Sequence, residues 1–503
     1  MVTREKDGLY TFKIPNPVIT DQFQCFCTID TPSEYRSNNM TGRMARVYKV
    51  NKLDDKGEAV GEPLVLKDVW LEQSALTERE IQNAIFNDIE KFWQAPTERE
   101  QMRKLQDNHK QLVKDKGYRH YFLGILSDHA GTTTTDYPAG AVIKTGLLQV
   151  PDPKKHTPII GSGTNSAFSD SCSNNEGTHP LYPNKIEVPV NPRTFEIKKH
   201  YRVVFQEVCK TVGRLGTLDE VVDFLALQLL YCAGWVHRDV SLGNIMAYRG
   251  NLDNDQEPWK VKLLDLEYAK KFPLPDDYEA AADPKTGTPY FMPLEVMLKY
   301  YLYSADTIRK MKVVRKRKSA FDMVDMAEER ASTCLTQGPT RAVVHNFQHD
   351  LESLWWILLW TVTCRIDSDA AFAYGRTVFV NEMVPTAARI GCFTTESILH
   401  LLKSFMPPST CNMPRSLAST IEAMRYALSV DGTQHTTASA WSAIHLINRK
   451  TTDTMKEELV ALGRKKRGRT DNDTVDPRQA EGEEKSQAKL AQTDDSSKGK
   501  NKE

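Results

Sequence analysis

The chain has 503 residues, 40% of them hydrophobic and 9% aromatic, which is long enough for two lobes with a sizeable core and extensions. Its 66 Lys and Arg residues balance 66 Asp and Glu residues, so the overall charge does not favour direct nucleic-acid binding. The nine cysteines show neither metal-ligand spacing nor a disulfide framework. The longest apolar run, at residues 351–364, contains Glu352 and is too short for a membrane span. We therefore expect an intracellular protein with reduced thiols, no membrane association and no signal peptide.

Hydrophobic periodicity predicts the elements of the first half. Alternating or continuous apolar residues predict strands at 41–51, 63–70, 121–126 and 201–208. A row of isoleucines after Thr77 predicts a helix that begins at residue 78, and the charged residues 97–116 predict a second, exposed helix. Residues 131–189 are rich in Ser, Thr, Gly, Pro and Asn, which predicts a long, partly disordered insertion at about 128–190.

The second half is predicted to be mainly helical. Amphipathic or apolar segments predict helices at 218–231, 351–364, 396–405, 417–428 and 438–447, and a short buried strand at 261–264. From residue 451 the chain is charged and poor in apolar residues, which predicts a disordered tail. The basic cluster from Arg464 to Arg469 in this tail is either a nuclear-localisation signal or an ordinary solvated charged face.

Three motifs follow one another along this half. The form H-R-D-x-x-x-x-N occurs in Gly-Trp-Val-His-Arg-Asp-Val-Ser-Leu-Gly-Asn at residues 234–244. An aspartate follows the apolar run at 261–264, and Gly-Thr-Pro-Tyr-Phe-Met-Pro-Leu-Glu occupies residues 287–295. The residues of the first two motifs that can carry chemistry are His237, Arg238, Asp239, Asn244 and Asp265.

The order and spacing of these motifs are typical of the transfer of the γ-phosphoryl group of ATP. That reaction needs positioning and charge neutralisation more than covalent participation of the protein. Asp239 would accept or orient the proton of the attacking hydroxyl, with His237 and Arg238 in the same turn. Asn244 and Asp265 offer hard oxygen ligands, which suit Mg²⁺ or Mn²⁺.

The chain resembles the fungal-type protein kinases. The sequence segments that carry this resemblance lie at residues 65–70, 202–208, 234–244, 264–269, 286–291 and 349–353. The resemblance implies an α+β, bilobal protein-kinase-like fold, with a small β-rich N-lobe, a larger mainly helical C-lobe, and ATP in the cleft between them. The implied organisation is an N-terminal extension at 1–39, an N-lobe at 40–208, a C-lobe at 209–450 and the tail at 451–503.

The resemblance also implies roles for residues of the N-lobe. Lys67 resembles the lysine that contacts the α- and β-phosphates, and Glu78 resembles the helix glutamate that pairs with it, with Glu80 as the competitor. The alternatives are an ordinary edge-strand lysine and a solvated glutamate in the first turn of a helix. Glu207 and Val208 resemble the hinge whose backbone bonds adenine.

Three residues of the C-lobe match supporting positions of the family. Thr288 matches the activation-segment threonine near the catalytic aspartate, and Glu295 matches the acid that closes this segment by pairing with an arginine, which the sequence does not single out. Asp350 resembles the aspartate that braces the backbone of the His-Arg-Asp turn, and a role as a helix N-cap is equally compatible with its position.

The chain departs from the family pattern in three places. Of the glycine-rich loop only Gly42 remains, so either the loop holds phosphate less closely or the side chains of Arg43 and Arg46 compensate. Ser241 replaces the lysine that Ser/Thr kinases commonly place two residues after the catalytic aspartate. The usual D-F-G reads Asp-Leu-Glu, and the carboxylate of Glu267 either binds a second Mg²⁺ or repels it.

We therefore expect a Ser/Thr-directed protein kinase that uses ATP and acts on a protein substrate. One alternative is a small-molecule phosphotransferase similar to aminoglycoside or choline kinases, because Asp-Leu-Glu-Tyr-Ala at 265–269 also resembles the acidic motif of that class. The other is an ATP-binding pseudokinase scaffold, which the degenerate glycine loop favours. The segment at 285–295 favours the protein substrate, since enzymes that bind no peptide lack it.

Overall fold

The computed structural model describes residues 2–5, 9–16, 19, 21–34, 44–98, 100–134, 197–212, 225–250, 257, 259–272, 288–302, 343–366, 368–394, 397–405 and 417–430. Most of the predicted insertion, the predicted helix at 438–447, the charged tail with its basic cluster from Arg464 to Arg469, and Gly42 lie outside these residues.

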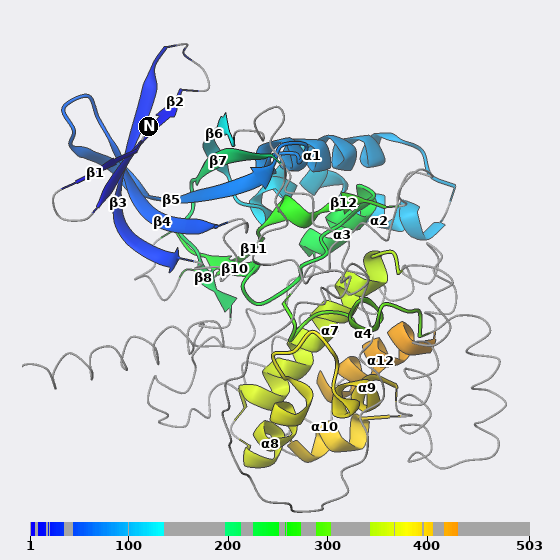
Figure 1. Ribbon diagram of the computed structural model, residues 1–503. Coiled ribbons are helices and arrows are strands. Elements are labelled where there is room, and N and C mark those ends of the chain that lie inside the picture. The colour runs from blue at the N-terminus through cyan, green and yellow to red at the C-terminus, as the bar shows by residue number, and fades with distance from the viewer. Residues whose placement is uncertain are drawn as a thin grey trace, which may run out of the picture.

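The N-terminal part is an antiparallel sheet whose strand order is β1-β2-β3-β4-β5-β7-β6 (Figure 1). Its strands are β1 (Val2–Arg4), β2 (Tyr10–Pro15), β3 (Phe23–Glu34), β4 (Arg46–Leu53), β5 (Ala59–Glu72), β6 (Ile125–Thr133) and β7 (Lys198–Phe205). Because β2 and β3 pair with each other and β3 pairs with β4, the sheet begins well before residue 40. The expected boundary at residues 39 and 40, between an N-terminal extension and the N-lobe, therefore lies too late in the chain.

Two of the predicted strands need further comment. A turn joins β4 to β5, where the Gly57 amide donates to the Asp54 carbonyl at 3.0 Å and Gly57 has φ 84°, a conformation that suits glycine. The predicted strand at 121–126 is wrong over most of its length. A 3-10 helix, η1 (Gly117–Tyr121), takes its first position, and β6 begins only at Ile125.

Helix α1 (Glu78–Gln94) joins the sheet to the rest of the molecule, with α2 (Glu100–Lys114) beside it. A capping box of Thr77 and Glu80 satisfies its first amides, and Ile81, Ile85 and Ile89 form its buried face. At its other end the Trp235 indole donates to Asp88 at 3.0 Å. The helix is therefore fixed to the segment that precedes the His-Arg-Asp turn.

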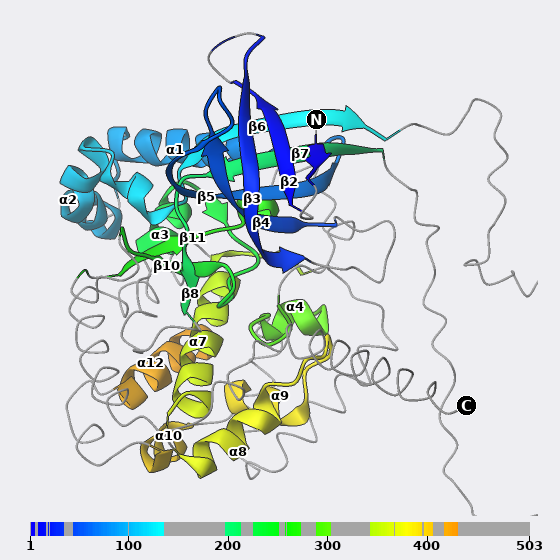
Figure 2. The same ribbon diagram turned by 90° about the vertical axis from the view of Figure 1, so that its left-hand side faces the viewer.

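The remaining elements form short strands below the sheet and a helical region. The strands are β8 (Lys210–Thr211), β9 (Trp235–Val236), β10 (Ile245–Tyr248), β11 (Lys260–Leu263) and β12 (Lys270–Lys271). The helices are α3 (Leu225–Cys232), α4 (Leu294–Leu298), α7 (Phe347–Cys364), α8 (Asp369–Val378), α9 (Ala387–Thr394), α10 (Leu399–Phe405) and α12 (Leu417–Val430). Figure 2 shows α7 running from the short strands down through this helical region.

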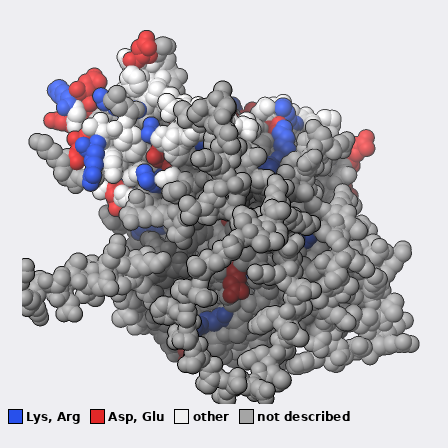
Figure 3. Space-filling model, in the orientation of Figure 1, with Lys and Arg blue, Asp and Glu red and all other residues white. Residues whose placement is uncertain are grey.

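One continuous core cluster extends from α1 through α3 to α7 and α12. Trp355 and Trp356 of α7 are fully buried at its centre, which explains why α7 is apolar on almost every face. No helix among the described residues is both long and apolar enough to cross a membrane. On the face shown in Figure 3, acidic and basic side chains lie interspersed over the described part of the sheet.

The core position of α1 generates a testable prediction. Ile85→Ala should lower the free energy of unfolding by about 2–5 kcal/mol, because it opens a cavity where the side chain is fully buried. Asn83→Ala, at an exposed position of the same helix, is the control and should change stability by less than about 0.5 kcal/mol. Urea unfolding followed by circular dichroism measures both, and equal midpoints for the two variants would contradict the packing.

Candidate active site

The carboxylate of Asp350 anchors the His-Arg-Asp turn from the first turn of α7. Its Oδ2 accepts the His237 amide at 2.6 Å, and its Oδ1 accepts the Arg238 amide at 2.9 Å. Its Oδ1 also lies 3.0 Å from Nε2 of His345. Burial opposes ionisation of Asp350, but the hydrogen bonds from His345 and the backbone hold the pKa of this carboxyl below its ordinary value.

Asp350 does not cap α7, so the N-cap alternative from the sequence is wrong. The cap is Asn346, whose side chain accepts the amides of Gln348 and His349. Arg238 has φ 74°, a left-handed conformation that is uncommon outside glycine. The two hydrogen bonds to Asp350 hold the backbone in this conformation, so the anchor also fixes where the next residue points.

His237 joins the turn to the strand that precedes Asp265. The Asp239 amide donates to Nδ1 of His237, so in the neutral ring the proton lies on Nε2. This Nε2 donates to the Leu264 carbonyl at 2.7 Å. His237 therefore has a structural role between the two motifs, and it is fully buried.

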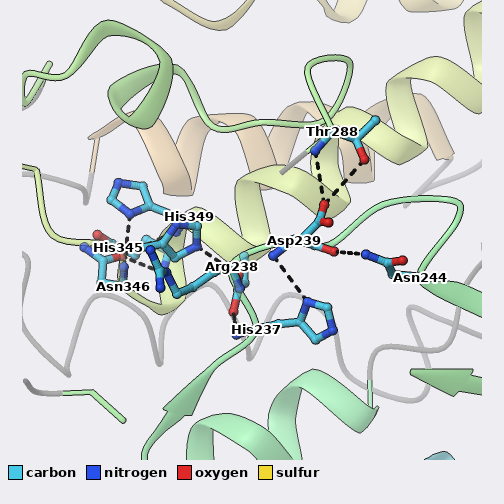
Figure 4. Close-up of polar contacts among 10 residues, drawn as sticks. His237, Arg238, Asp239, Asn244, Thr288, His345, Asn346 and His349 are labelled. Atoms are coloured by element: carbon cyan, nitrogen blue, oxygen red, sulfur yellow. Dashed lines mark hydrogen bonds and ion pairs between the residues drawn. The ribbon is translucent and has the colours of Figure 1, made fainter. Parts of the chain in front are cut away.

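Asp239 lies between the loop that follows it and Thr288 (Figure 4). Its Oδ1 accepts the Thr288 amide at 3.1 Å, with the Thr288 hydroxyl at 3.4 Å. Nδ2 of Asn244 donates to the Asp239 carbonyl at 2.8 Å, and the Asn244 carbonyl accepts the Leu264 amide at 2.9 Å. The asparagine thus closes the catalytic loop against the strand that leads to Asp265.

Lys67 of β5 reaches three carboxylates. Its Nζ lies 2.7 Å from Asp265, 3.2 Å from Glu78 and 3.3 Å from Glu267. Burial alone lowers the pKa of Lys67, but these three carboxylates raise it well above its ordinary value, so the ammonium form persists. Glu80, the competing candidate, is engaged in the capping box of α1 and does not contact Lys67.

The oxygen ligands present fit Mg²⁺. Because Asn244 uses Nδ2 as a donor, its Oδ1 is the atom that suits a cation, and Asp265 supplies a carboxylate. Within the described ranges, no group of three or more His, Cys, Asp or Glu side chains is arranged to hold a metal. Mg²⁺ is usually held by one or two protein ligands together with water and phosphate, so Asn244 and Asp265 would be enough to hold it.

Glu207 and Val208 lie between β7 and β8, where the chain leaves the sheet. The Glu207 carboxylate accepts the Gly124 amide at 2.8 Å and pairs with Lys262 at 2.8 Å. Lys262 also donates to the Phe122 carbonyl at 2.9 Å. The side chain of Glu207 therefore braces this connection, a role that the sequence analysis did not predict. The sequence feature that could have indicated this role is Lys262, a lysine within the short strand β11 that needs a buried partner.

Two contacts hold Glu295 of α4. Its Oε2 lies 3.0 Å from Nε2 of His349, and its Oε1 accepts the Leu302 amide at 2.8 Å. Its described partners are thus a histidine and a backbone amide, and the expected pair with an arginine stays a prediction. The buried Arg389 donates to the Met292 carbonyl at 2.9 Å.

Glu352 completes this support of the segment. It accepts the Leu294 amide at 2.8 Å and the Trp356 indole at 2.9 Å. Burial raises its pKa to about 7, although both hydrogen bonds oppose the shift. Ser241 has no comparable contacts: it is fully buried, and its hydroxyl has no partner among the described residues.

The anchor can be tested by its effect on stability. Asp350→Ala should lower the free energy of unfolding by about 2–5 kcal/mol, because it leaves two buried backbone amides without acceptors. Asp350→Asn keeps one side-chain oxygen that can accept a hydrogen bond, so its free energy of unfolding should fall by less. Thermal unfolding measures this, and the melting temperature should fall from wild type to Asp350→Asn and further to Asp350→Ala. A wild-type melting temperature for Asp350→Ala would refute the bracing role.

The raised pKa of Glu352 predicts a pH-dependent effect. The folded state binds this proton more tightly than the unfolded state, so the contribution of Glu352 to stability is present below about pH 4.5 and is lost as the pH rises through 7. Glu352→Gln cannot ionise. The difference in free energy of unfolding between this variant and wild type should therefore shift in favour of the variant by on the order of 2 kcal/mol from pH 5 to pH 8.

Thermal unfolding at both pH values checks this gain, with the exposed Glu382→Gln as the matched control. The control should differ from wild type by the same amount at pH 5 and pH 8. A Glu352→Gln variant whose difference from wild type does not change with pH would show that Glu352 ionises normally.

Solved structures match this chain, whereas no curated protein does. The solved structures that match include one described as "ROP18 kinase domain in complex with AMP-PNP and sucrose". It is 10% identical, has a TM-score of 0.37, and the match covers 90% of this chain and 85% of that chain.

The sequence profile of a family described as "Fungal protein kinase" matches residues 24–362, which is more than half of the chain. This range contains every residue of the proposed catalytic turn and its anchor. The expected α+β bilobal kinase fold is confirmed by this match together with the β-rich sheet and the helical region. The resemblance read from the motifs is confirmed as well: the chain belongs to the fungal protein kinase family.

Proposed function

We propose that the protein is an ATP-dependent protein kinase that transfers the γ-phosphoryl group of Mg-ATP to a Ser or Thr hydroxyl of a protein substrate. Membership of the family supports phosphoryl transfer in general. The observation that carries the finer proposal is the position of Asp239, whose carboxylate lies 3.4 Å from the Thr288 hydroxyl. An aliphatic hydroxyl can thus approach this carboxylate within hydrogen-bonding range.

Asp239 is the proposed base. It would accept or orient the proton of the substrate hydroxyl as the oxygen attacks the γ-phosphorus, and the bond from that phosphorus to the β-phosphate bridging oxygen breaks. The neighbouring residues serve this geometry. His237 and Arg238 place the carboxylate through their backbone bonds to Asp350, and Thr288 holds one of its oxygens.

Lys67 is the proposed contact for the α- and β-phosphates, with Glu78 holding its ammonium in place. Asn244 and Asp265 are the proposed ligands of the metal, which when bound supplies neutralisation of phosphate charge. The backbone of Glu207 and Val208 is the proposed adenine contact. Gly42 remains the proposed phosphate-loop glycine, and it lies outside the described residues.

The anchoring of residues 288–302 supports a protein substrate over a small molecule. Thr288 binds the catalytic aspartate, Glu295 binds His349, and Arg389 binds the Met292 carbonyl. The segment is thereby fixed along its described length, beside the proposed base. A small-molecule acceptor needs no such platform, whereas a peptide hydroxyl must be presented to Asp239 from a defined surface.

The test is transfer of radiolabelled phosphate from ATP in the presence of Mg²⁺ or Mn²⁺, with generic protein substrates. Asp239→Ala should reduce the rate at least about 100-fold, because removal of a general base costs that much, and Asp265→Ala should do the same through loss of a metal ligand. The label should appear on Ser or Thr after acid hydrolysis.

The control is Glu382→Gln, an exposed substitution on the C-lobe that should transfer at the wild-type rate. Wild-type turnover by Asp239→Ala would refute the assigned chemistry. Label that enters small metabolites and never protein would favour the small-molecule phosphotransferase, and ATP binding without any transfer would favour the scaffold.

A further inference from the structure

The charge balance around Lys67 is unusual. One ammonium group contacts Asp265, Glu78 and Glu267, so these four groups carry two negative charges in excess. An ammonium has three N–H groups, and each is within 3.3 Å of a different carboxylate. In this state the hydrogen-bonding capacity of Lys67 is fully used.

Glu267 is the carboxylate that phosphoryl transfer does not require, because the common D-F-G motif of protein kinases has glycine at this position. It lies in the one-turn helix η5 (Leu266–Tyr268), two residues after Asp265, with only 10% of its side chain exposed. A long side chain on a single turn can turn away from Lys67 more readily than Glu78, which is buried at the start of the seventeen-residue helix α1. Glu267 is therefore the contact that a phosphate oxygen can most easily replace.

We propose that Glu267 makes the nucleotide site select metal-bound nucleotide over free nucleotide. Its carboxylate accepts a hydrogen bond from the Lys67 ammonium and adds negative charge beside the position of the phosphates. This inference rests on the proposed function, since it concerns the same nucleotide site.

The electrostatic reason is simple. A free nucleoside phosphate brings further negative charge into a site that already carries an excess, and partial burial strengthens the repulsion relative to water. A metal-bound nucleotide carries less negative charge, and its arrival allows Glu267 to leave Lys67. The glycine of the common motif would impose no such penalty on the free nucleotide.

The experiment measures dissociation constants for ADP in the presence of excess EDTA and in the presence of Mg²⁺, for wild type and Glu267→Gln. Glutamine has the same size and no charge. We expect the variant to bind metal-free ADP about tenfold more tightly than wild type, with a smaller change for Mg-ADP, so that the preference for the metal-bound form decreases. Glu72→Gln removes an exposed charge from the same strand as Lys67 and should leave both constants unchanged.

A second measurement follows the contact itself. The rate at which an amine-directed acetylating reagent modifies Lys67 at pH 8, read by mass spectrometry, should rise in Glu267→Gln, because one of the three carboxylates that hold its ammonium group is removed. The rate for Glu72→Gln should equal that of wild type. Thermal unfolding confirms that each variant is folded before either measurement is compared.

Three outcomes decide the proposal. Looser binding of metal-free ADP by wild type than by Glu267→Gln supports it. Unchanged constants, or weaker Mg-ADP binding by the variant with no gain for metal-free ADP, would overturn it, and the latter result would assign Glu267 to the metal. If neither protein bound ADP under either condition, the proposed function would fail and the selectivity with it, which is distinguishable from a failure confined to Glu267.

Discussion

The site depends on a buried carboxylate that never meets the reacting atoms. Asp350 receives the amides of His237 and Arg238, and no other described acceptor satisfies these two buried groups. Once they are held, Arg238 is fixed in a left-handed conformation, Asp239 faces Thr288, and the His237 ring reaches the Leu264 carbonyl. A single helix, α7, therefore sets the position of the proposed base and of the strand that leads to Asp265, the proposed metal ligand.

The second constraint is electrostatic, and it joins the two lobes. Lys67 comes from the sheet, Glu78 from α1, and Asp265 with Glu267 from the segment after β11. Three carboxylates around one ammonium hold these elements together when no phosphate is near, yet each nucleotide must compete with them. The same cluster thus joins these elements and carries the proposed preference for metal-bound nucleotide. The glutamate that replaces glycine in the usual D-F-G motif adds a third carboxylate to this cluster.

The turn that carries the proposed base could be predicted from the sequence because its residues lie close together in the chain, whereas Lys67 and Asp350 come from distant segments. The motif at 237–244 and the aspartate after β11 have the spacing that phosphoryl transfer needs, and the pairing of a strand lysine with a helix glutamate follows from family resemblance. The histidine that pairs with Glu295 could not be predicted, because 54 residues separate them and only the packing of α4 against α7 brings them together. The strands before residue 40 could have been predicted from the sequence, since alternate residues such as Phe12 and Ile14 are buried. Their membership of the same sheet could not, because it depends on which strand each one pairs with.

The most direct test of the account is a crystal structure of the protein with a non-hydrolysable ATP analogue and Mg²⁺. We predict a metal ion about 2.1 Å from Oδ1 of Asn244 and from the carboxylate of Asp265, a phosphate oxygen in hydrogen-bonding contact with Lys67, and Glu267 turned away from that lysine. A nucleotide whose phosphates lie away from Lys67, or a metal that touches neither Asn244 nor Asp265, would contradict the assignment of this cluster as the phosphoryl-transfer site.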